Sequence, residues 1–250
     1  MRKNKRIAAV IPAFNEAESI RKVLEEIPKW VDVVVVADNG STDGTGDIAE
    51  RAGAEVVVEK RRGYGSACLA GIAALPKPNS KNAPEIVGFL DADFSDNPKE
   101  FEELVDPILS GEFDLVIGSR STGQSERRAL GLTQRFGNWL SCKLIGLLFG
   151  GNFSDLGPFR AIRWTSFHEL GMDDKDFGWT VQMQIRALKK GLRVREVPVT
   201  YRRRAAGKSK VSGTIRGIFG AGTTILYVVF KEAWDSRTKG VNRSSRLHSE

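Results

Sequence analysis

Apolar runs alternate with amphipathic segments along the first half of the chain. We predict five strands there, at 6–11, 31–37, 54–58, 86–90 and 113–118. Helical spacing of apolar residues predicts helices at 17–27, 64–75 and 98–109, and a polar turn at 38–45 leads into another that runs through Arg51. Continuous apolar strands are typical of a sheet that is buried on both faces. The pattern therefore predicts an α/β fold with a mostly parallel central sheet and helices on both faces.

The second half of the chain is less regular. Helices are predicted at 135–149, within 176–190 and at 214–230, and strands after the turn at 155–160 and at 194–201. The uncharged run at 217–230 is shorter than the roughly 20 apolar residues that a membrane-spanning helix needs. We interpret 214–235 as an amphipathic helix that associates with a membrane or docks on a partner, and 236–250 as a disordered tail.

Polar clusters follow three of the predicted strands. Asn15 and Glu16 come after the first, Asp38 after the second, and Asp91 and Asp93 after the strand at 86–90. The carboxyl ends of parallel strands meet at one edge of a sheet, where α/β proteins bind ligands. We therefore expect these side chains to build a single site.

The segment Asp91-Ala92-Asp93 carries the most informative chemistry of that site. Mg²⁺ and similar cations bind a few protein carboxylates and complete their coordination with substrate phosphates. Two acids separated by one small residue therefore suggest a site for a metal ion and a diphosphate. The alternative is a solvated turn that starts the next helix, because Asp96-Asn97-Pro98 is itself a helix-start pattern.

Charge is unevenly distributed. The chain has 38 Lys and Arg against 31 Asp and Glu, a net charge of +7, and the region 197–231 contains basic but no acidic residues. Such a region suits phosphates, anionic lipid or nucleic acid. A nucleic-acid binder is disfavoured because the basic loop at 202–212 has no interleaved aromatic residue beyond the adjacent Tyr201. Two cysteines without disulfide spacing and the absence of a signal-peptide pattern predict a cytoplasmic protein.

Several short motifs occur in a characteristic order. They are IPAFNE at 11–16, DNGSTDGT at 38–45, RRGYGSA at 61–67, DAD at 91–93, GSR at 118–120, FRA at 159–161 and RRRAAGKSK at 202–210. In this order and spacing the chain resembles the family 2 glycosyltransferases of the GT-A fold, and within them the dolichyl- or polyprenyl-phosphate sugar transferases. The resemblance covers roughly residues 7–212.

The resemblance implies a role for individual residues. Those matching the nucleotide-binding positions are Pro12, Ala13, Asn15, Glu16, Asp38 and Asp91. Asp93, with Asp91, matches the metal-binding acids, and Arg120 matches an arginine near the sugar phosphate. Arg204, Ser209 and Lys210 match a loop that closes over phosphates. The implied cofactor is Mg²⁺ or Mn²⁺, and the implied donor is a nucleotide-diphosphate sugar.

Two features depart from the family pattern. Ser95 stands where the polyprenyl-phosphate enzymes often have a glutamine that joins the metal shell, and the spacing from Asp155 to Phe159 is one residue shorter than usual. A hydroxyl acceptor would also require a carboxylate base, for which Asp155 and Asp176 are the candidates. An anionic lipid phosphate would need no base.

These observations predict a metal-dependent, inverting hexosyltransferase. Its expected domain is 1–213, with a nucleotide-sugar half at 1–120 and an acceptor half at 121–213, and its catalytic residues are Asp91, Asp93, Arg120 and Asp176. The favoured acceptor is a polyprenyl phosphate, reached by peripheral contact at the cytoplasmic face of a membrane, and a homo-oligomer is possible. The alternatives are a soluble or lipid hydroxyl acceptor and, as another class, a sugar-phosphate nucleotidyltransferase, which would release pyrophosphate.

Overall fold

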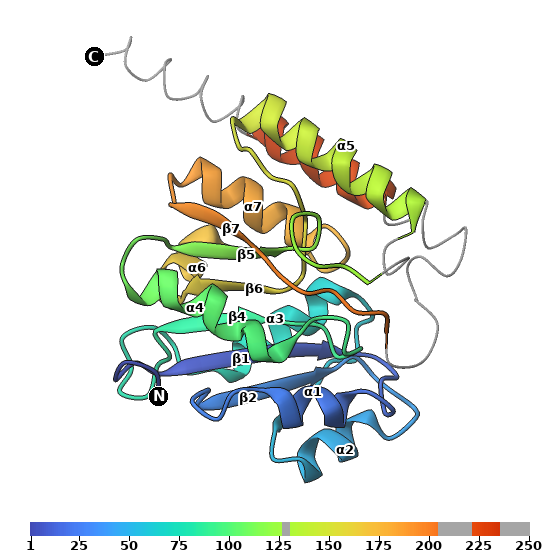
Figure 1. The fold of residues 1–250 in the computed structure, drawn as a ribbon, viewed down its shortest axis with the longest axis vertical. Coiled ribbons are helices and arrows are strands. Elements are labelled where there is room, and N and C mark those ends of the chain that lie inside the picture. Colours follow the sequence, from blue (N-terminus) through green and yellow to red (C-terminus); the bar gives the residue numbers. More distant parts are fainter. Residues whose placement is uncertain (127–130, 205–221, 236–250) are drawn as a thin grey trace.

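The structure is a computed structural model, and it describes residues 1–126, 131–204 and 222–235 (Figure 1). Two of the residues expected to bind phosphate, Ser209 and Lys210, lie outside the described residues. So do the start of the predicted helix at 214–235 and the tail at 236–250.

A seven-stranded sheet forms the centre of the described chain. In spatial order its strands are β3 (Glu55–Val58), β2 (Val33–Asp38), β1 (Ile7–Ala13), β4 (Ile86–Phe89), β6 (Arg160–Arg163), β5 (Leu115–Ser119) and β7 (Val194–Pro198). Only β6 runs antiparallel to its neighbours, β4 and β5. The prediction of a mostly parallel sheet is confirmed, and the carboxyl ends of the other strands meet at one edge.

Helices cover both faces of this sheet, because the side chains of β1 are apolar on both of its faces. On one face, Ile7, Ala9 and Ile11 pack against α1 (Ile20–Glu26), α2 (Thr45–Arg51) and α4 (Phe101–Leu109). On the other face, Ala8 and Val10 pack with α3 (Tyr64–Ala74), α6 (Trp164–Leu170) and α7 (Trp179–Lys189). Successive side chains of a strand point to opposite faces, so a strand without polar positions must be buried on both.

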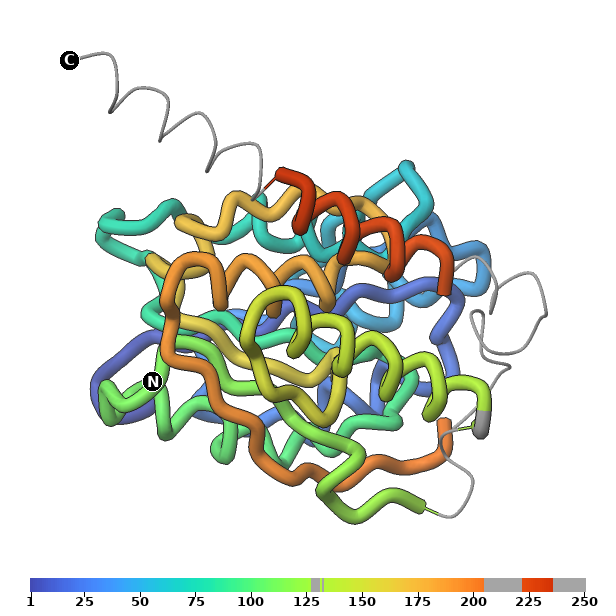
Figure 2. Tube along the Cα trace, turned by 90° about the horizontal axis from the view of Figure 1, so that it is seen from above, coloured from blue at the N-terminus to red at the C-terminus, as the bar shows by residue number. Residues whose placement is uncertain are grey.

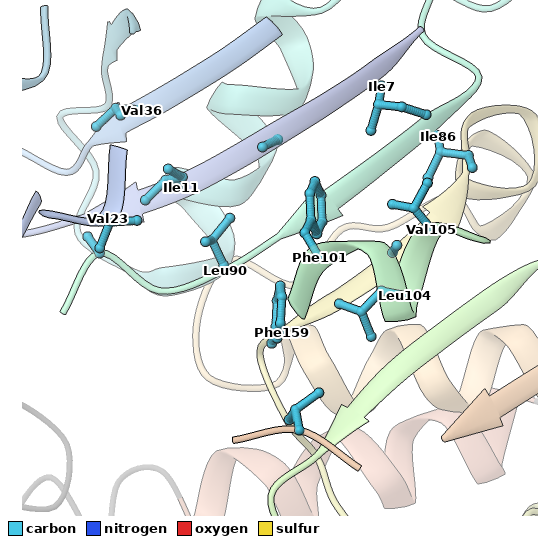
Figure 3. Close-up of a cluster of buried hydrophobic side chains, with 14 of the residues drawn as sticks. Ile7, Ile11, Val23, Val36, Ile86, Leu90, Phe101, Leu104, Val105 and Phe159 are labelled. Carbon is cyan, nitrogen blue, oxygen red and sulfur yellow. The ribbon is translucent and has the colours of Figure 1, made fainter. Parts of the chain in front are cut away.

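Phe101 occupies the middle of the first face. Its ring stacks between Trp30, 5.8 Å away, and Phe159, 5.9 Å away (centroid distances). Figure 3 shows Phe101 and Phe159 side by side over the strands. A Cβ at position 88 of β4 would overlap the Phe101 ring, so Gly88 provides the space in which this ring lies against the sheet.

A third apolar cluster joins three helices at the end of the molecule beyond β5 and β7. Cys142 and Ile145 of α5 (Leu132–Phe149) pack with Val181 of α7, and Val228 and Val229 of a helix at 222–235 belong to the same cluster. Figure 1 shows α5 and the 222–235 helix at this end, and Figure 2 looks onto it. None of the helices in the described ranges is both long and apolar enough to cross a membrane.

The elements differ from the prediction in several places. Helix α1 begins at Ile20 rather than at Ala17, and the last strand ends at Pro198, although Tyr201 still forms isolated bridges. The described part of the helix interpreted at 214–235 is helical from 222 to 235. Helix α6 and the reversed direction of β6 were not predicted.

Candidate active site

The strand-end clusters do lie together. Strands β2 and β4 lie on either side of β1 and both pair with it in parallel, so the residues that follow the three strands emerge at the same edge of the sheet. Ala13 is the register partner of Asp38, and the Asn39 amide donates to the Ala13 carbonyl at 2.8 Å. Pro12 and Ala13, expected in a loop, are instead the last residues of β1.

A hydrogen-bond network fixes the loops after β1 and β2 against each other. The Asn15 amide donates to Ser41 Oγ and the Thr42 amide donates to Asn15 Oδ1, both at 2.9 Å. The Ser41 amide donates to Asp38 Oδ1 at 2.8 Å. Asn15 adopts a positive φ of 52°, which is uncommon outside glycine and is found at constrained loops. The two loops are therefore held together at this edge of the sheet by hydrogen bonds.

Asp91, Asp93 and Asp96 form an acidic loop beyond β4. Asp93 is 5% exposed and Asp96 is 1% exposed, whereas Asp91 is half-buried. Asp96 Oδ2 accepts a bond from the Asp91 amide at 3.1 Å, and Asp96 Oδ1 has no hydrogen-bond partner among the described residues. Asp96 was interpreted from the sequence as a helix start and was missed as a member of the site.

Ser95 holds one oxygen of Asp93. Its amide donates to Asp93 Oδ1 at 2.8 Å and its hydroxyl to the same oxygen at 2.5 Å. Between them Phe94 has a positive φ of 65°, and its ring lies under the Arg202 guanidinium. Ser95, a departure from the family pattern, thus orients the carboxylate of Asp93.

The carboxylates perturb one another. Burial, followed by the charge of Asp93, raises the pKa of Asp91 to about 7, against the opposing effects of Arg204 and Arg120. Burial and the charge of Asp91 also raise the pKa of Asp96. A divalent cation would relieve this repulsion, because it is the larger local charge. The donor set therefore fits a hard cation.

Coordination by the protein alone would be incomplete. No group of three or more His, Cys, Asp or Glu side chains with metal-binding geometry lies in the described part of the chain. A cation on Asp91 and Asp93 would thus take further oxygens from a bound ligand, as Mg²⁺ does at phosphate sites.

Arg204 connects two of the loops. Its Nη1 lies 3.2 Å from Asp93 Oδ2, and its Nη2 pairs with Glu16 Oε1. The expected phosphate-binding arginine therefore lies at the acidic loop, facing the oxygen of Asp93 that Ser95 does not hold.

Arg120, at the end of β5, is bound by Asp155. Its Nε donates to Asp155 Oδ2 at 2.8 Å, its Nη2 to Oδ1 at 2.7 Å and its amide to Oδ2 at 2.7 Å. Asp155 is fully buried. Both of its oxygens are engaged, so the structure makes Asp155 the partner of Arg120 rather than a free base. The Arg120 guanidinium also lies 5.1 Å from the centre of the Tyr201 ring.

Asp176 lies beside the start of α3, where its carbonyl accepts from the Gly65 amide at 3.3 Å. It lines a pocket of about 390 Å³ that also includes Arg61, Tyr227 and Lys231 but neither Asp91 nor Asp93. Its carboxylate is exposed, and partial burial together with Asp174 raises its pKa. Of the expected catalytic residues, the structure brings Asp91, Asp93 and Arg120 together and leaves Asp176 in this neighbouring pocket.

Known proteins resemble this chain along most of its length. Residues 8–171 match the model of glycosyl transferase family 2. An uncharacterized glycosyltransferase of Mycobacterium tuberculosis is 38% identical over 215 residues, 84% of this chain and 92% of that protein. The undecaprenyl-phosphate mannosyltransferase of Micrococcus luteus is 32% identical over 225 residues, 85% of this chain and 90% of that protein.

A solved structure shares the fold. It is the glucosyl-3-phosphoglycerate synthase of Mycobacterium tuberculosis in complex with Mn²⁺, uridine diphosphate and glucosyl-3-phosphoglycerate. The TM-score is 0.70 at 24% identity, with 92% of this chain and 80% of that chain covered. The expected GT-A architecture is thereby confirmed.

Proposed function

The chain belongs to glycosyl transferase family 2, and we propose that it moves a hexose from a nucleotide-diphosphate sugar to a polyprenyl phosphate at a membrane surface, with inversion at the sugar carbon. The observation that carries the proposal is the meeting of Asp91 and Asp93 with the guanidinium groups of Arg120 and Arg204 at one edge of the sheet. Paired carboxylates and cations at that edge suit a metal-bound diphosphate.

Each group has a role in breaking the bond to the sugar. Asp93 and Asp91 would hold Mg²⁺ or Mn²⁺, which supplies charge stabilisation for the leaving diphosphate. Arg204 exchanges its contact with Asp93 for the diphosphate oxygens. Arg120, with its orientation fixed by Asp155, would stabilise the same charge. Such preorganised donors stabilise charge that develops in the transition state.

The acceptor side favours a phosphate. Asp155 has both oxygens bound by Arg120, and Asp176 lines a different pocket from the acidic loop. A hydroxyl acceptor needs a carboxylate placed to remove its proton, whereas a phosphate oxygen is already an anionic nucleophile. The Micrococcus relative is named for an undecaprenyl-phosphate acceptor, which supports the same choice.

Exposed aromatic side chains on two helices, here called the aromatic surface, support binding to a bilayer. Helix α5 exposes Phe136 and Trp139, and the 222–235 helix exposes Phe230 and Trp234, each at more than half of its area. Both helices lie at the end seen in Figure 2. Helix α5 contains Arg135 and Lys143 but no acidic residue. Aromatic side chains beside basic ones are typical of helices that lie in the interface of an anionic membrane.

The test pairs donors with acceptors. Purified protein would be incubated with UDP, GDP, CDP or dTDP sugars, Mg²⁺ or Mn²⁺, and either undecaprenyl phosphate in anionic vesicles or 3-phosphoglycerate in solution. We expect one nucleotide, a metal requirement, transfer to the lipid and release of a nucleoside diphosphate. Transfer only to the soluble acid would overturn the lipid acceptor, and release of pyrophosphate would overturn the reaction class.

The Asp93→Asn variant tests the metal site, because it keeps the shape of the side chain and removes its charge. The amide oxygen can still accept from Ser95, so the loop should keep its shape, but the charge for the cation is lost. We expect the transfer rate to fall by about 10²–10³-fold with an unchanged melting temperature. A rate within a factor of two of the parent would remove Asp93 from the metal site.

A further inference from the structure

The short loop before β6 is held almost entirely by side chains. Residues 154–156 belong to no helix or strand. Nevertheless, every backbone N–H and C=O of Ser154, Asp155 and Leu156 is hydrogen-bonded, in each case to a side chain. Buried backbone groups must find partners, but here the partners come from four separate elements of the fold.

Glu196 and Asn138 make most of these bonds. Glu196, on β7, accepts from the Ser154 amide at 2.9 Å, from the Asp155 amide at 3.0 Å and from Ser154 Oγ at 2.8 Å. Asn138, on α5, donates to the Ser154 carbonyl at 3.0 Å and accepts from the Leu156 amide at 2.9 Å.

Two further side chains complete the set. Gln184, on α7 and fully buried, donates to the Asp155 carbonyl at 3.0 Å. Arg160, on β6, donates to the Leu156 carbonyl at 3.2 Å. The position of the Asp155 backbone is therefore determined by α5, α7, β6 and β7 together.

The consequence of this arrangement falls on Arg120. Asp155 is the carboxylate that binds the Arg120 guanidinium through both oxygens, and the charge of Arg120 reaches Asp91 and Asp96. A displacement of the 154–156 loop would move Asp155 and, with it, the guanidinium.

We propose that Glu196 and Asn138 are positioning residues that fix Arg120 for transfer by holding the 154–156 loop. Within the described ranges, the side-chain hydrogen bonds of Glu196 and Asn138 go to residues 154–156 and not to the acidic loop, so both act through Asp155. The effect on transfer rests on the proposed function, but the effect on the Arg120 side chain does not.

The first experiment observes Arg120 directly. In protein labelled with ¹⁵N-arginine, the Nε–H signal of Arg120 is assigned by its loss in Arg120→Lys. We expect a sharp, slowly exchanging signal in the parent that shifts or broadens in Glu196→Gln and in Asn138→Asp. In Glu196→Gln, an NH₂ group replaces an oxygen that accepts from the amides of the loop. In Asn138→Asp, an oxygen replaces the NH₂ group that donates to the Ser154 carbonyl. The control is Glu55→Gln, an exposed glutamate on the edge strand β3, which should leave the signal unchanged.

The second experiment separates positioning from general stability. Glu196→Gln should lower kcat by about 10–100-fold, since small misplacements of catalytic groups cost this much. In an Arg120→Lys background, where the two-oxygen pairing is already lost, it should lower kcat no further. If Glu196→Gln does not fold, Asn138→Asp replaces it in the same comparison of the parent and Arg120→Lys backgrounds. An unchanged Nε–H signal, or an equal fall in kcat in both backgrounds, would overturn the proposal.

Discussion

At the scale of single residues, Ser95 shows how one hydroxyl orients Asp93, the carboxylate that we propose as a metal ligand. Its amide and its hydroxyl both bind Asp93 Oδ1, which leaves Oδ2 toward Arg204. Groups that orient a metal ligand are commonly worth 10–100-fold in metal affinity or activity. The small side chain at this position is thus suited to orienting the ligand rather than to binding the cation itself.

We expect Ser95→Ala to weaken Mn²⁺ binding in the presence of a nucleoside diphosphate by about 10-fold or more. The reason is that Asp93 keeps the amide bond but loses the hydroxyl bond. Isothermal titration calorimetry would measure the affinity. Ser110→Ala, which removes an exposed hydroxyl bonded to Glu112 and Pro107, is the control. Equal Mn²⁺ affinity in both variants would contradict this role.

The place of the candidate site residues after parallel strands could be predicted from the sequence, because the position of a strand end depends on a local pattern. Asp96 was missed, since its pattern with Asn97 and Pro98 also starts a helix, and indeed a short 3₁₀ turn begins at Pro98. The sequence suggested Asp155 as a candidate base. Its bond to Arg120 was missed, because the two residues are distant in sequence. Pairings of that kind have no local signature.

At the scale of elements, the 222–235 helix is held by ion pairs as well as by apolar packing. Glu232 is 2% exposed, and it binds Arg186 and Lys189 of α7, each at 2.7 Å. Burial alone would raise the pKa of Glu232, but the hydrogen bonds from Lys189 and Arg186 outweigh it and lower the pKa.

We expect Glu232→Gln to lower the free energy of unfolding by about 1.5–3 kcal/mol at pH 7, the usual value of hydrogen bonds to charged groups. Because the folded-state pKa is lowered, this contribution is complete above the ordinary glutamate pKa and disappears as pH falls through the lowered value. Urea unfolding of parent and variant should therefore converge below about pH 4. Glu50→Gln, at an exposed position of α2, should show no such difference, and a gap that persists at low pH would contradict the assignment.

The strands and helices with continuous or periodic patterns were predicted to within a few residues. Helix α6 was not, because its seven residues are too few to show a clear period. The direction of β6 was not predicted either, since a strand of four residues carries no mark of its orientation. The partners of Glu232 in the 222–235 helix lie on α7, and such tertiary contacts have no local pattern in the sequence.

At the scale of the whole molecule, the aromatic surface and the acidic loop belong to one body. Helix α5 exposes Trp139 on the outside, and on the inside its Asn138 binds the loop that holds Asp155. Two neighbouring residues of α5 thus face in different directions. Trp139 faces the proposed bilayer, and Asn138 faces the 154–156 loop that positions Arg120.

We expect the double variant Trp139→Gln, Trp234→Gln to bind anionic vesicles at least tenfold more weakly, because each exposed indole loses apolar area that the bilayer would bury. Vesicle co-sedimentation would measure the affinity. The control is Val58→Ser, which changes an exposed apolar residue on the edge strand β3. Donor binding should remain unchanged in both proteins, and vesicle binding equal to that of the parent would rule out this surface as the membrane contact.

The position of β7 has a consequence for the order of folding. A ribosome synthesises Asp91, Asp93 and Asp96 long before Arg204, which follows β7. Until β7 has paired with β5, the three carboxylates lack this cation, and their repulsion opposes closure of the acidic loop. We therefore expect the acidic loop to reach its final arrangement only after β7 has left the ribosome and paired with β5.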